Sequence, residues 1–413
     1  MTIGSIVIVG AGHAGFQTAA SLRQDGFQGR ITLVGDETGL PYQRPPLSKA
    51  YLLGKLNRES LSFRASDFFD EHRITFIRDR AVAIDRSCAR VTLRSAETLP
   101  YEHLVLATGA HNRTLTVPGA DLQGLFGLRT VADADMIASA LVNARDVIVV
   151  GAGFIGLEFA AVARAMGAGV RVLELADRPM ARAVTPTAAK VFCEAYEAWG
   201  VKVEFGQQVA SFSGEGGRVT GVNTSDGRYL SADLVLVGIG VQPNVELGAN
   251  AGLTIENGIR VDAHLLTSDP AISAIGDNVF FPSQHAGGHI RLESVQNAVD
   301  QARHVAARLC GRPKAYAALP WFWSDQGDLR LQIAGLPCRH DATIAIGDMA
   351  NRSFSVLCFR HGELVTVESV NRPGDHMAAR RLLARPPTLT PAAASEPGFD
   401  LRAWEASPRC TIA

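Results

Sequence analysis

Two stretches of the chain share one order of hydrophobic and polar positions. In each, a continuous apolar run typical of a fully buried strand leads into a glycine-rich turn and a helical stretch. The apolar runs are residues 5–9 and 146–150, and each stretch continues into a second β-rich run, at 31–34 and 170–173. Because two buried strands joined by a helix form a βαβ unit of a parallel sheet, the sequence predicts two such units.

Shorter alternating stretches follow each unit and predict β-meanders. They lie at residues 74–77, 81–85, 90–93, 209–212 and 219–223. A buried strand that ends in glycine closes each half, at 104–109 and 234–240. We therefore expect an α/β protein with two Rossmann-type dinucleotide-binding domains, each with an inserted meander.

The pattern changes near residue 319, which predicts a C-terminal α+β domain. Residues 354–360 and 363–370 flank a His-Gly turn and predict a hairpin. A helix is expected at 375–383. The prolines and alanines after it predict a loosely held tail.

The glycines of the two turns match what a bound pyrophosphate requires. The first permits a tight turn, the second lets the backbone approach the phosphates, and the third lets helix and strand pack closely. The amino end of the helix then supplies N–H donors and a positive dipole end. Each second strand also ends in an acidic residue, Asp36 or Glu174, as in nucleotide-binding units.

Composition and charge narrow the function. Lysine and arginine total 40 against 41 aspartate and glutamate, a net charge of −1, which argues against a nucleic-acid binder. Hydrophobic residues make up 47% of the 413, enough for ordinary cores in two or three domains.

The six cysteines are scattered and unpatterned, which argues against a disulfide framework or a zinc site and favours a reducing compartment. We expect no metal. The start of the chain has no signal-type segment, and the longest apolar stretch, 147–163, is interrupted by Glu158 and three glycines. A cytoplasmic protein without a membrane segment is expected.

Three further segments carry a resemblance to a known family: PYQRPPLSK at 41–49, ESVQNA at 293–298 and WFWSDQ at 321–326. Together with the two glycine turns they resemble the oxygenase-coupled NADH–ferredoxin reductases. That family falls within the glutathione-reductase structural class of two-dinucleotide flavoproteins. The resemblance covers residues 3 to about 384.

The resemblance implies three domains and two dinucleotides, non-covalent FAD and NADH. The FAD-binding domain would be discontinuous, residues 1–112 and 241–318, with an NAD-binding domain at 113–240 and a C-terminal domain at 319–413. Matching FAD positions are Gly10, Gly12, Ala14, Gly15, Asp36, Lys49, Val82, Arg129, Asp277 and Val295. The expected NAD positions are Gly151, Gly153, Gly156, Glu158, Glu174 and Gly240.

Three of the matching side chains carry the expected chemistry. In relatives, a lysine and a glutamate lie beside the hydride-accepting nitrogen of the flavin, which assigns these roles to Lys49 and Glu158. Without the resemblance, Lys49 would be a solvated loop lysine and Glu158 a carboxylate favoured by a helix dipole. Trp323 is expected near the flavin and Trp321 on the opposite face of its strand; a plain core role is the alternative for both.

The sequence also lacks a redox thiol, because no cysteine lies between Met1 and Asp85. Electrons would therefore leave the flavin directly, to an outside acceptor. The resemblance implies that this acceptor is a 2Fe–2S ferredoxin of a cytochrome monooxygenase or dioxygenase. Ferredoxins of this type are acidic, and candidate residues for a basic docking surface are Arg291, Arg303, Arg308 and Arg312. These arginines do not form one helical stripe, so a mixed solvated surface is the alternative.

Two other functions stay open at this point. One is a flavoprotein similar to apoptosis-inducing factor, with a signalling or binding role; the other is a protein that binds FAD structurally without turnover. The balanced charge counts against the first.

Overall fold

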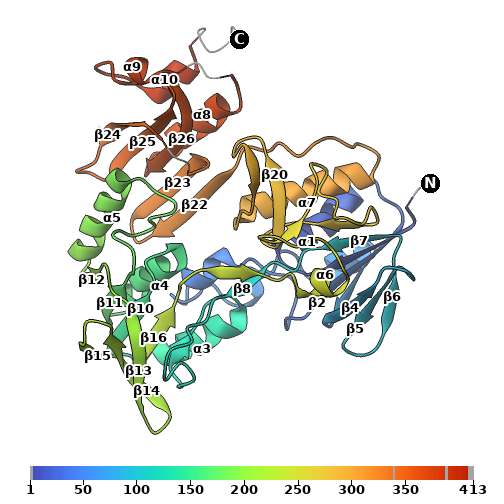
Figure 1. Cartoon of the computed structure of the whole chain (residues 1–413), viewed down its shortest axis with the longest axis horizontal. Helices are drawn as coiled ribbons and strands as arrows, with labels where there is room; N and C mark the ends of the chain where they lie inside the picture. The colour runs from blue at the N-terminus through green and yellow to red at the C-terminus, as the bar shows by residue number, and fades with distance from the viewer. Residues whose placement is uncertain (1–2, 338–339, 387–388, 408–413) are drawn as a thin grey trace. The chain divides into compact units, whose positions relative to one another are not determined.

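The computed structural model describes residues 3–337, 340–386 and 389–407 and is shown in Figure 1. The chain forms two compact units, each assembled from distant segments. The first contains Met1–Gln43, Glu59–His111 and Gln242–Pro320, and the second contains Arg44–Arg58, Asn112–Val241 and Trp321–Ala413. Arg44–Arg58, which the sequence assigns to the FAD-binding domain, thus groups with the second unit. The domain limits stay a prediction.

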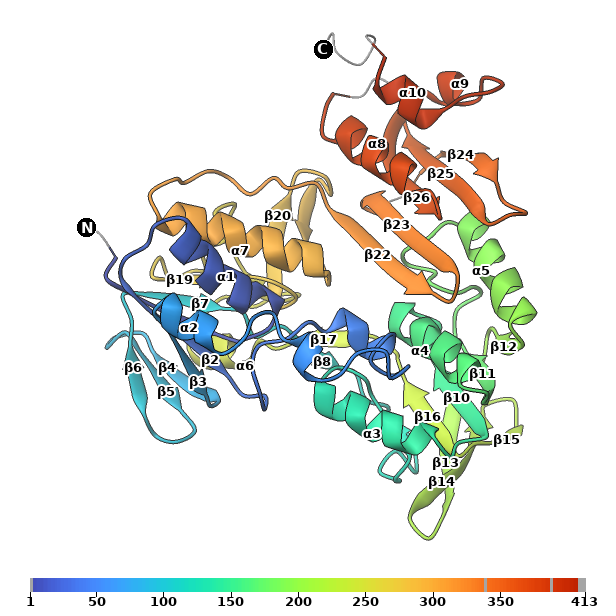
Figure 2. The same cartoon turned by 180° about the vertical axis from the view of Figure 1, so that it is seen from behind.

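A five-stranded parallel sheet forms the centre of the first unit. Its strand order is β19 (Ile272–Ala274), β7 (His103–Leu106), β1 (Ser5–Val9), β2 (Arg30–Gly35) and β3 (Ile74–Arg78). Strands β1 and β7 are central, and their apolar side chains are buried on both faces, which explains their continuous apolar sequence. Helices α1 (His13–Gln24) and α7 (Val295–Leu309) lie side by side (Figure 2).

Strand β3 corrects one expectation. Residues 74–78 pair in parallel with β2 and do not belong to the meander that their alternation predicts. An edge strand of this sheet is only partly covered, with Ile74 buried and Phe76 and Ile77 half-buried, so it alternates like a meander strand. The meander itself comprises β4 (Ala81–Asp85), β5 (Arg90–Leu93) and β6 (Thr98–Pro100).

The remaining elements between β2 and α7 are short. They are η1 (Pro45–Ser48), η2 (Glu59–Leu61), α2 (Asp67–Glu71), β8 (Ala110–Asn112), β17 (Val241–Pro243), α6 (Glu246–Asn250), β18 (Ile259–Arg260), β20 (Val279–Ser283) and β21 (Gly288–Ile290). The chain leaves the first unit along β8 and returns along β17.

The second unit repeats the parallel architecture. Its sheet has the order β12 (Val201–Glu204), β11 (Gly169–Leu173), β10 (Asp146–Val150), β16 (Leu234–Val237) and β9 (Leu125–Phe126). The helices are α3 (Val131–Leu141), α4 (Phe154–Ala165) and α5 (Pro186–Ala198). The predicted meander is confirmed as β13 (Val209–Glu215), β14 (Arg218–Thr224) and β15 (Tyr229–Ser231).

The C-terminal part of the second unit is an antiparallel sheet covered by helices. Its order is β22 (Trp321–Gln326), β23 (Leu329–Gly335), β26 (Glu363–Val370), β25 (Ser353–Arg360) and β24 (Ala342–Asp348). The predicted hairpin is confirmed as β25 and β26, and its turn residues His361 and Gly362 have φ of +53° and +82°, as a tight hairpin turn requires. Helix α8 (Pro373–Leu383) begins at Pro373, earlier than the sequence predicts.

The segment after α8 is not a loose tail where the structure describes it. It contains α9 (Pro391–Ala394) and α10 (Leu401–Glu405). Leu389, Ala394 and Leu401 are buried in the same core as α8, which anchors the segment. Pro387 and residues 408–413 lie outside the described residues. Among the helices that are described, none combines the length and apolar character needed to cross a membrane.

One buried carboxylate ties the C-terminal sheet to the Rossmann-type half of the same unit. Glu368 on β26 is buried, and it accepts hydrogen bonds from the backbone N–H of Thr185, at 2.8 Å, and from the Thr185 hydroxyl, at 2.7 Å. Thr185 is the N-cap residue of α5. Burial, opposed by these two bonds, raises the pKa of Glu368 to about 7.

This pKa predicts a pH dependence of stability. The folded-state pKa of Glu368 lies above its ordinary value of 4.5. The contribution of Glu368 to the free energy of unfolding is therefore complete below about pH 4.5, and it is lost as the pH rises through about 7. The whole effect is on the order of 3 kcal/mol at 1.36 kcal/mol per pKa unit. Glu368→Gln should flatten the corresponding fall in thermal midpoint between about pH 5 and about pH 8. Glu363→Gln, at an exposed position of β26, is the control. Parallel curves for Glu368→Gln and the wild type would contradict the assignment.

Candidate active site

The first glycine turn joins β1 to α1. Gly10 has a φ of +107°, and a Cβ there would lie 2.2 Å from the carbonyl oxygen of Ala107. A Cβ on Gly15 would lie 1.8 Å from the carbonyl oxygen of Gly10. Neither position therefore accepts a side chain. At Gly12, by contrast, no described atom lies within 4 Å of such a Cβ, so its backbone borders open space.

The amino end of α1 opens onto this space. Gly12 is the N-cap residue, it offers no side-chain cap, and the first turn of the helix has no acidic residue. The N–H of Phe16 donates to the carbonyl of Gly12 at 3.0 Å, and the N–H groups of a first helical turn favour an external anion. The turn, with Ala14 buried in it, fits the pyrophosphate of a dinucleotide.

Two further predicted FAD positions of the first unit are accessible. The Asp36 side chain follows β2 and is 54% exposed, with Arg80 Nε 3.7 Å from Oδ2. Val82 on β4 is exposed although it is apolar. A ribose hydroxyl can reach Asp36, and an apolar contact can form at Val82; both roles stay predictions.

A second turn of the first unit lies against the first. A Cβ at Gly276 would lie 3.3 Å from the Cβ of Ala14, so the turn that carries Asp277 adjoins the start of α1. The Gly276 N–H donates to Oε1 of Gln301 at 2.7 Å, and Gln301 is fully buried on α7, the helix that begins at Val295. Sequence analysis missed Gln301. Its indication was a polar residue at a buried helical position.

The second glycine turn has the same geometry as the first. Gly151 has a φ of +103°, and a Cβ there would lie 2.5 Å from the carbonyl oxygen of Gly238. A Cβ on Gly156 would lie 2.2 Å from the carbonyl oxygen of Gly151. Among the described atoms, a Cβ on Gly153 would have one neighbour within 4 Å, the Gly238 oxygen at 3.9 Å. The same anion-binding cradle thus exists twice.

Glu174 lies where β11 ends, beside the second glycine turn. Its Oε2 accepts from the N–H of Ala152 at 2.6 Å, and its Oε1 accepts from the N–H of Ala176 at 2.8 Å. These bonds fix the carboxylate, and each oxygen keeps a lone pair for a ribose hydroxyl. Gly240, with a φ of +101°, shapes the loop between β16 and β17.

The structure brings the predicted pair together in the second unit. Glu158 on α4 is buried, and its Oε1 lies 2.9 Å from Nζ of Lys49. The hydroxyl of Ser48 donates to Oε2 at 2.5 Å, and the hydroxyl of Ser324 donates to Oε1 at 2.6 Å. Three donors therefore satisfy the oxygens of this buried side chain. Ser48 and Ser324 were missed because serine in a loop or strand carries no chemical signature of its own.

Trp323 and Trp321 lie on β22, and both are half-buried. Their ring centroids are 5.5 Å apart, which corrects the expectation of opposite faces. Side chains two residues apart in a strand share a face, whereas the intervening ones point the other way. The Arg380 guanidinium lies 4.5 Å from the ring centroid of Trp321. Flavin proximity of Trp323 stays a prediction.

Arg129 connects two segments of this unit. Its carbonyl oxygen accepts from Nη1 of Arg44 at 2.7 Å, and its N–H donates to Oδ2 of Asp133 at 3.0 Å. Arg129 therefore links the start of α3 to the loop that carries Lys49. Its contact with FAD stays a prediction.

Redox thiols and metal ligands are not gathered in the described parts of the chain. The cysteines described there, Cys88, Cys193, Cys310 and Cys358, form no disulfide with one another. No group of three or more His, Cys, Asp or Glu in those parts could hold a metal ion.

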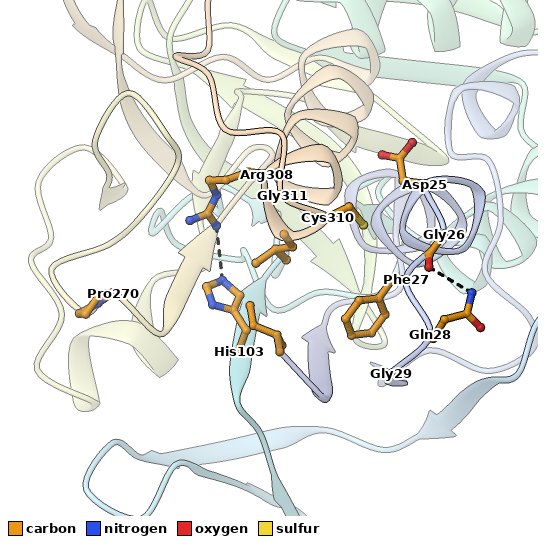
Figure 3. A pocket seen from close by; sticks show the side chains of 12 residues that line it. Asp25, Gly26, Phe27, Gln28, Gly29, His103, Pro270, Arg308, Cys310 and Gly311 are labelled. Atoms are coloured by element: carbon orange, nitrogen blue, oxygen red, sulfur yellow. Dashed lines mark hydrogen bonds between the residues drawn. The ribbon is translucent and has the colours of Figure 1, made fainter. Parts of the chain in front are cut away.

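A pocket of the first unit lies away from both glycine turns (Figure 3). Its lining includes Phe27, Cys310 and His103, the first residue of β7. It therefore lies at the amino ends of the strands, whereas dinucleotides bind at the carboxyl ends. Arg308 also lines it and donates to Ser273 Oγ at 2.5 Å. Burial, followed by the charge of Arg308, lowers the pKa of His103 to about 3, so this histidine stays neutral.

These contacts correct part of the expected basic surface. Arg308 is turned inward to the pocket. The Arg291 side chain is 10% exposed and bonds to the Asp277 carbonyl and, at 2.5 Å, to Glu293. Arg303 and Arg312 remain exposed on or just after α7. Two of the four arginines are therefore used internally.

Comparisons with known proteins match two family models to the chain. The family described as pyridine nucleotide-disulphide oxidoreductase matches residues 4–302, and the reductase C-terminal family matches residues 321–404. The chain is 50% identical to rhodocoxin reductase of Rhodococcus erythropolis over 399 residues, 96% of this chain and 93% of that protein.

Two solved structures are similar over almost the whole chain. One is a ferredoxin reductase from Rhodopseudomonas palustris, with a TM-score of 0.96, 51% identity, and coverage of 98% of this chain and 100% of that one. The other is the covalent complex of putidaredoxin reductase with putidaredoxin, with a TM-score of 0.94, 38% identity and the same coverage.

The open space at Gly12 and Gly153 generates a prediction. An alanine at either position should leave the fold intact, because its methyl group meets little protein, yet it fills space that a pyrophosphate needs. Gly12→Ala should lower FAD affinity about tenfold or more, a loss of about 1.4 kcal/mol. Gly153→Ala should retain FAD and raise the KM for NADH. Equilibrium dialysis of FAD and steady-state kinetics measure these effects.

Gly288→Ala is the matched control, because no described atom lies within 4 Å of a Cβ at that position either. It should change neither affinity. Unaltered FAD binding in Gly12→Ala would remove this turn from the FAD site.

Proposed function

The chain belongs to the pyridine nucleotide-disulphide oxidoreductase family, and from that premise we propose that it is an FAD-dependent NADH–ferredoxin reductase. It transfers electrons from NADH through FAD to a 2Fe–2S ferredoxin of a cytochrome monooxygenase or dioxygenase, in the cytoplasm. The observation that carries the proposal is the pair of equivalent glycine turns together with a site that holds Lys49 against Glu158. Relatives across nearly the full length are ferredoxin reductases, which favours electron transfer over the signalling alternative.

Bound FAD supplies the redox chemistry, by accepting a hydride from NADH and releasing electrons singly. The protein binds and orients the reactants. We assign the first glycine turn, Asp36 and the turn of Asp277 to FAD, and the second glycine turn and Glu174 to NADH.

Lys49 and Glu158 supply electrostatics. The ammonium group stabilises negative charge as it develops on the flavin, and the buried carboxylate keeps that ammonium in one position. The loop that carries Lys49 contains no cysteine, and Ser48 beside Lys49 presents a hydroxyl. A hydroxyl cannot undergo thiol–disulfide exchange, so electrons leave without a thiol intermediate.

The ferredoxin partner is expected to be acidic. Of the four candidate arginines, Arg303 and Arg312 remain available for a basic docking surface, because the other two make internal contacts. Arg312 also pairs with Asp25 at 2.6 Å, which reduces its net contribution.

An anaerobic reduction experiment tests the function. NADH should bleach the flavin absorbance of the purified holoenzyme, and rapid reduction of cytochrome c should require an added 2Fe–2S ferredoxin. This ferredoxin-dependent rate should fall with salt, because exposed charges are screened within about 8 Å at physiological ionic strength. Cytochrome c reduction that is equally fast without ferredoxin, or a flavin that NADH does not bleach, would overturn the proposal.

The fixed Glu174 carboxylate predicts the coenzyme. A 2′-phosphate about 4 Å from it would be repelled by on the order of 4 kcal/mol per charge pair at an effective dielectric constant of about 20. Even half of that is roughly thirtyfold in kcat/KM. Wild-type protein should therefore prefer NADH, and Glu174→Ala should narrow the preference mainly through a higher KM for NADH.

Glu215→Ala is the control for this change, since Glu215 is an exposed acid at the β13–β14 hairpin. Its preference should equal that of the wild type. Equal use of NADPH and NADH by the wild-type protein would remove Glu174 from the coenzyme site.

A further inference from the structure

A chain of buried polar side chains lies behind Glu158. The Ser324 hydroxyl, which donates to Glu158, accepts from Nε2 of Gln326 at 3.1 Å. Oε1 of Gln326 accepts from the Tyr196 hydroxyl at 2.9 Å. Ser324, Gln326 and Tyr196 are all 1% exposed or less. Four side chains from α4, β22 and α5 are thus connected without solvent.

Every bond of this chain has the same direction. Tyr196 donates to Gln326, Gln326 donates to Ser324, and Ser324 donates to Glu158. An ionised carboxylate can only accept, so it fixes the hydroxyl of Ser324 as its donor. The oxygen of Ser324 then needs a donor behind it, and that requirement orients the amide of Gln326.

The same four side chains can form a second complete set of hydrogen bonds, in which donor and acceptor are exchanged in every bond. A protonated Glu158 donates to Ser324, Ser324 donates to the amide oxygen of a turned-over Gln326, and the amide nitrogen donates to Tyr196. Tyr196 then donates only to the Leu157 carbonyl, which is the second acceptor of its hydroxyl in the structure, at 2.8 Å. The direction of the chain is therefore coupled to the charge of Glu158.

One contact favours the first arrangement. Nε2 of Gln326 also donates to Sδ of Met180 at 3.6 Å, and a turned-over amide would place its oxygen against this weak acceptor. Burial, and secondarily the charge of Glu158, raise the pKa of Tyr196 well above its ordinary value, so its hydroxyl keeps its proton in either arrangement.

We propose that Tyr196, Gln326 and Ser324 are positioning residues, which form a polarised hydrogen-bond chain that holds Glu158 as an oriented anion for Lys49. The inference rests on the proposed function in that Lys49 and Glu158 are assigned there to the flavin. The chain itself is a property of the protein. Tyr196 acts on Glu158 from the opposite end, through two intervening side chains.

Other charged groups also lie near α4. Lys49 pairs directly with Glu158, and the charge of Glu158 contributes to the raised pKa of Tyr196. On the strands packed around α4, Asp146 bonds to Ser231, Arg171 pairs with Glu204 and Asp325 pairs with Arg330, and Lys202 on β12 is exposed to solvent.

A double-mutant cycle on the thermal midpoint of the oxidised holoenzyme tests the coupling. Tyr196→Phe keeps the ring and removes the donor. With Glu158 present, the carboxylate imposes the direction of the hydrogen bonds, and Tyr196→Phe should lower the thermal midpoint by its full amount. In a Glu158→Gln background, the decrease caused by Tyr196→Phe should be smaller by about half or more. In a Ser324→Ala background the hydrogen-bond chain is interrupted, so Tyr196→Phe should lower the thermal midpoint equally with Glu or Gln at position 158. Equal losses with Glu158 and Gln at 158, while Ser324 is intact, would overturn the proposal.

Tyr316→Phe is the matched control, because the hydroxyl of Tyr316 bonds to Asn297 in the first unit at 3.2 Å. Its cost should not depend on residue 158.

The pH profile of flavin reduction by NADH gives a second readout. Ser324→Ala should move the acid limb of this profile to higher pH. Ser324→Thr keeps the hydroxyl, so its acid limb should lie at the wild-type pH. Ser273→Ala, outside the hydrogen-bond chain, should leave the acid limb unchanged. An acid limb that Ser324→Ala does not move would count against positioning. If NADH reduces no flavin in the wild type, the proposed function fails, while the thermal cycle still decides on the chain.

Discussion

The buried carboxylate of Glu158 constrains the relative positions of three segments of the second unit. An ion removed from water costs several kcal/mol unless charged or hydrogen-bonding partners replace its solvent. Glu158 obtains those partners from positions 110 and 166 residues away in the sequence, Ser48 and Ser324, and from the Lys49 ammonium at 2.9 Å. Helix α4, the loop around residue 48 and strand β22 are therefore constrained by one charge, and a shift of any of the three removes at least one donor from it.

Close backbone approach is the second constraint. In both Rossmann-type sheets, the glycine turn comes so near other backbone that a single added Cβ would lie within about 2.5 Å of a carbonyl oxygen. At Gly10 and Gly151 that oxygen belongs to the segment after a neighbouring strand, and at Gly15 and Gly156 it belongs to the first glycine of the turn itself. The middle glycines differ, because they border space and not protein. The repetition in sequence thus reflects two separate requirements at each turn, one from packing and one from the ligand.

Sequence patterns predicted the local features well and the long-range ones poorly. The buried strands, the β25–β26 hairpin and the meander of the second half depend on local alternation and turn residues, and they were confirmed. Residues 74–78 were assigned wrongly because a half-covered parallel edge strand alternates like a meander strand. Arg308 was placed outside because neither Ser273 nor the pocket is visible in the sequence around it. Ser324 and Gln301 gain importance only through partners that are distant along the chain.

The C-terminal sheet has a consequence for modularity. A segment that begins near residue 319 with its own sheet and helices looks detachable, as a domain that could be exchanged between reductases. Yet Ser324 supplies a donor to Glu158, and Glu368 receives two from Thr185, so each half leaves a buried polar group of the other unsatisfied when they part. A chimera that joined this half to a foreign C-terminal segment would need to inherit both contacts. The exchangeable unit is therefore the pair of halves with its two carboxylates, and the boundary seen along the chain is not a boundary for recombination.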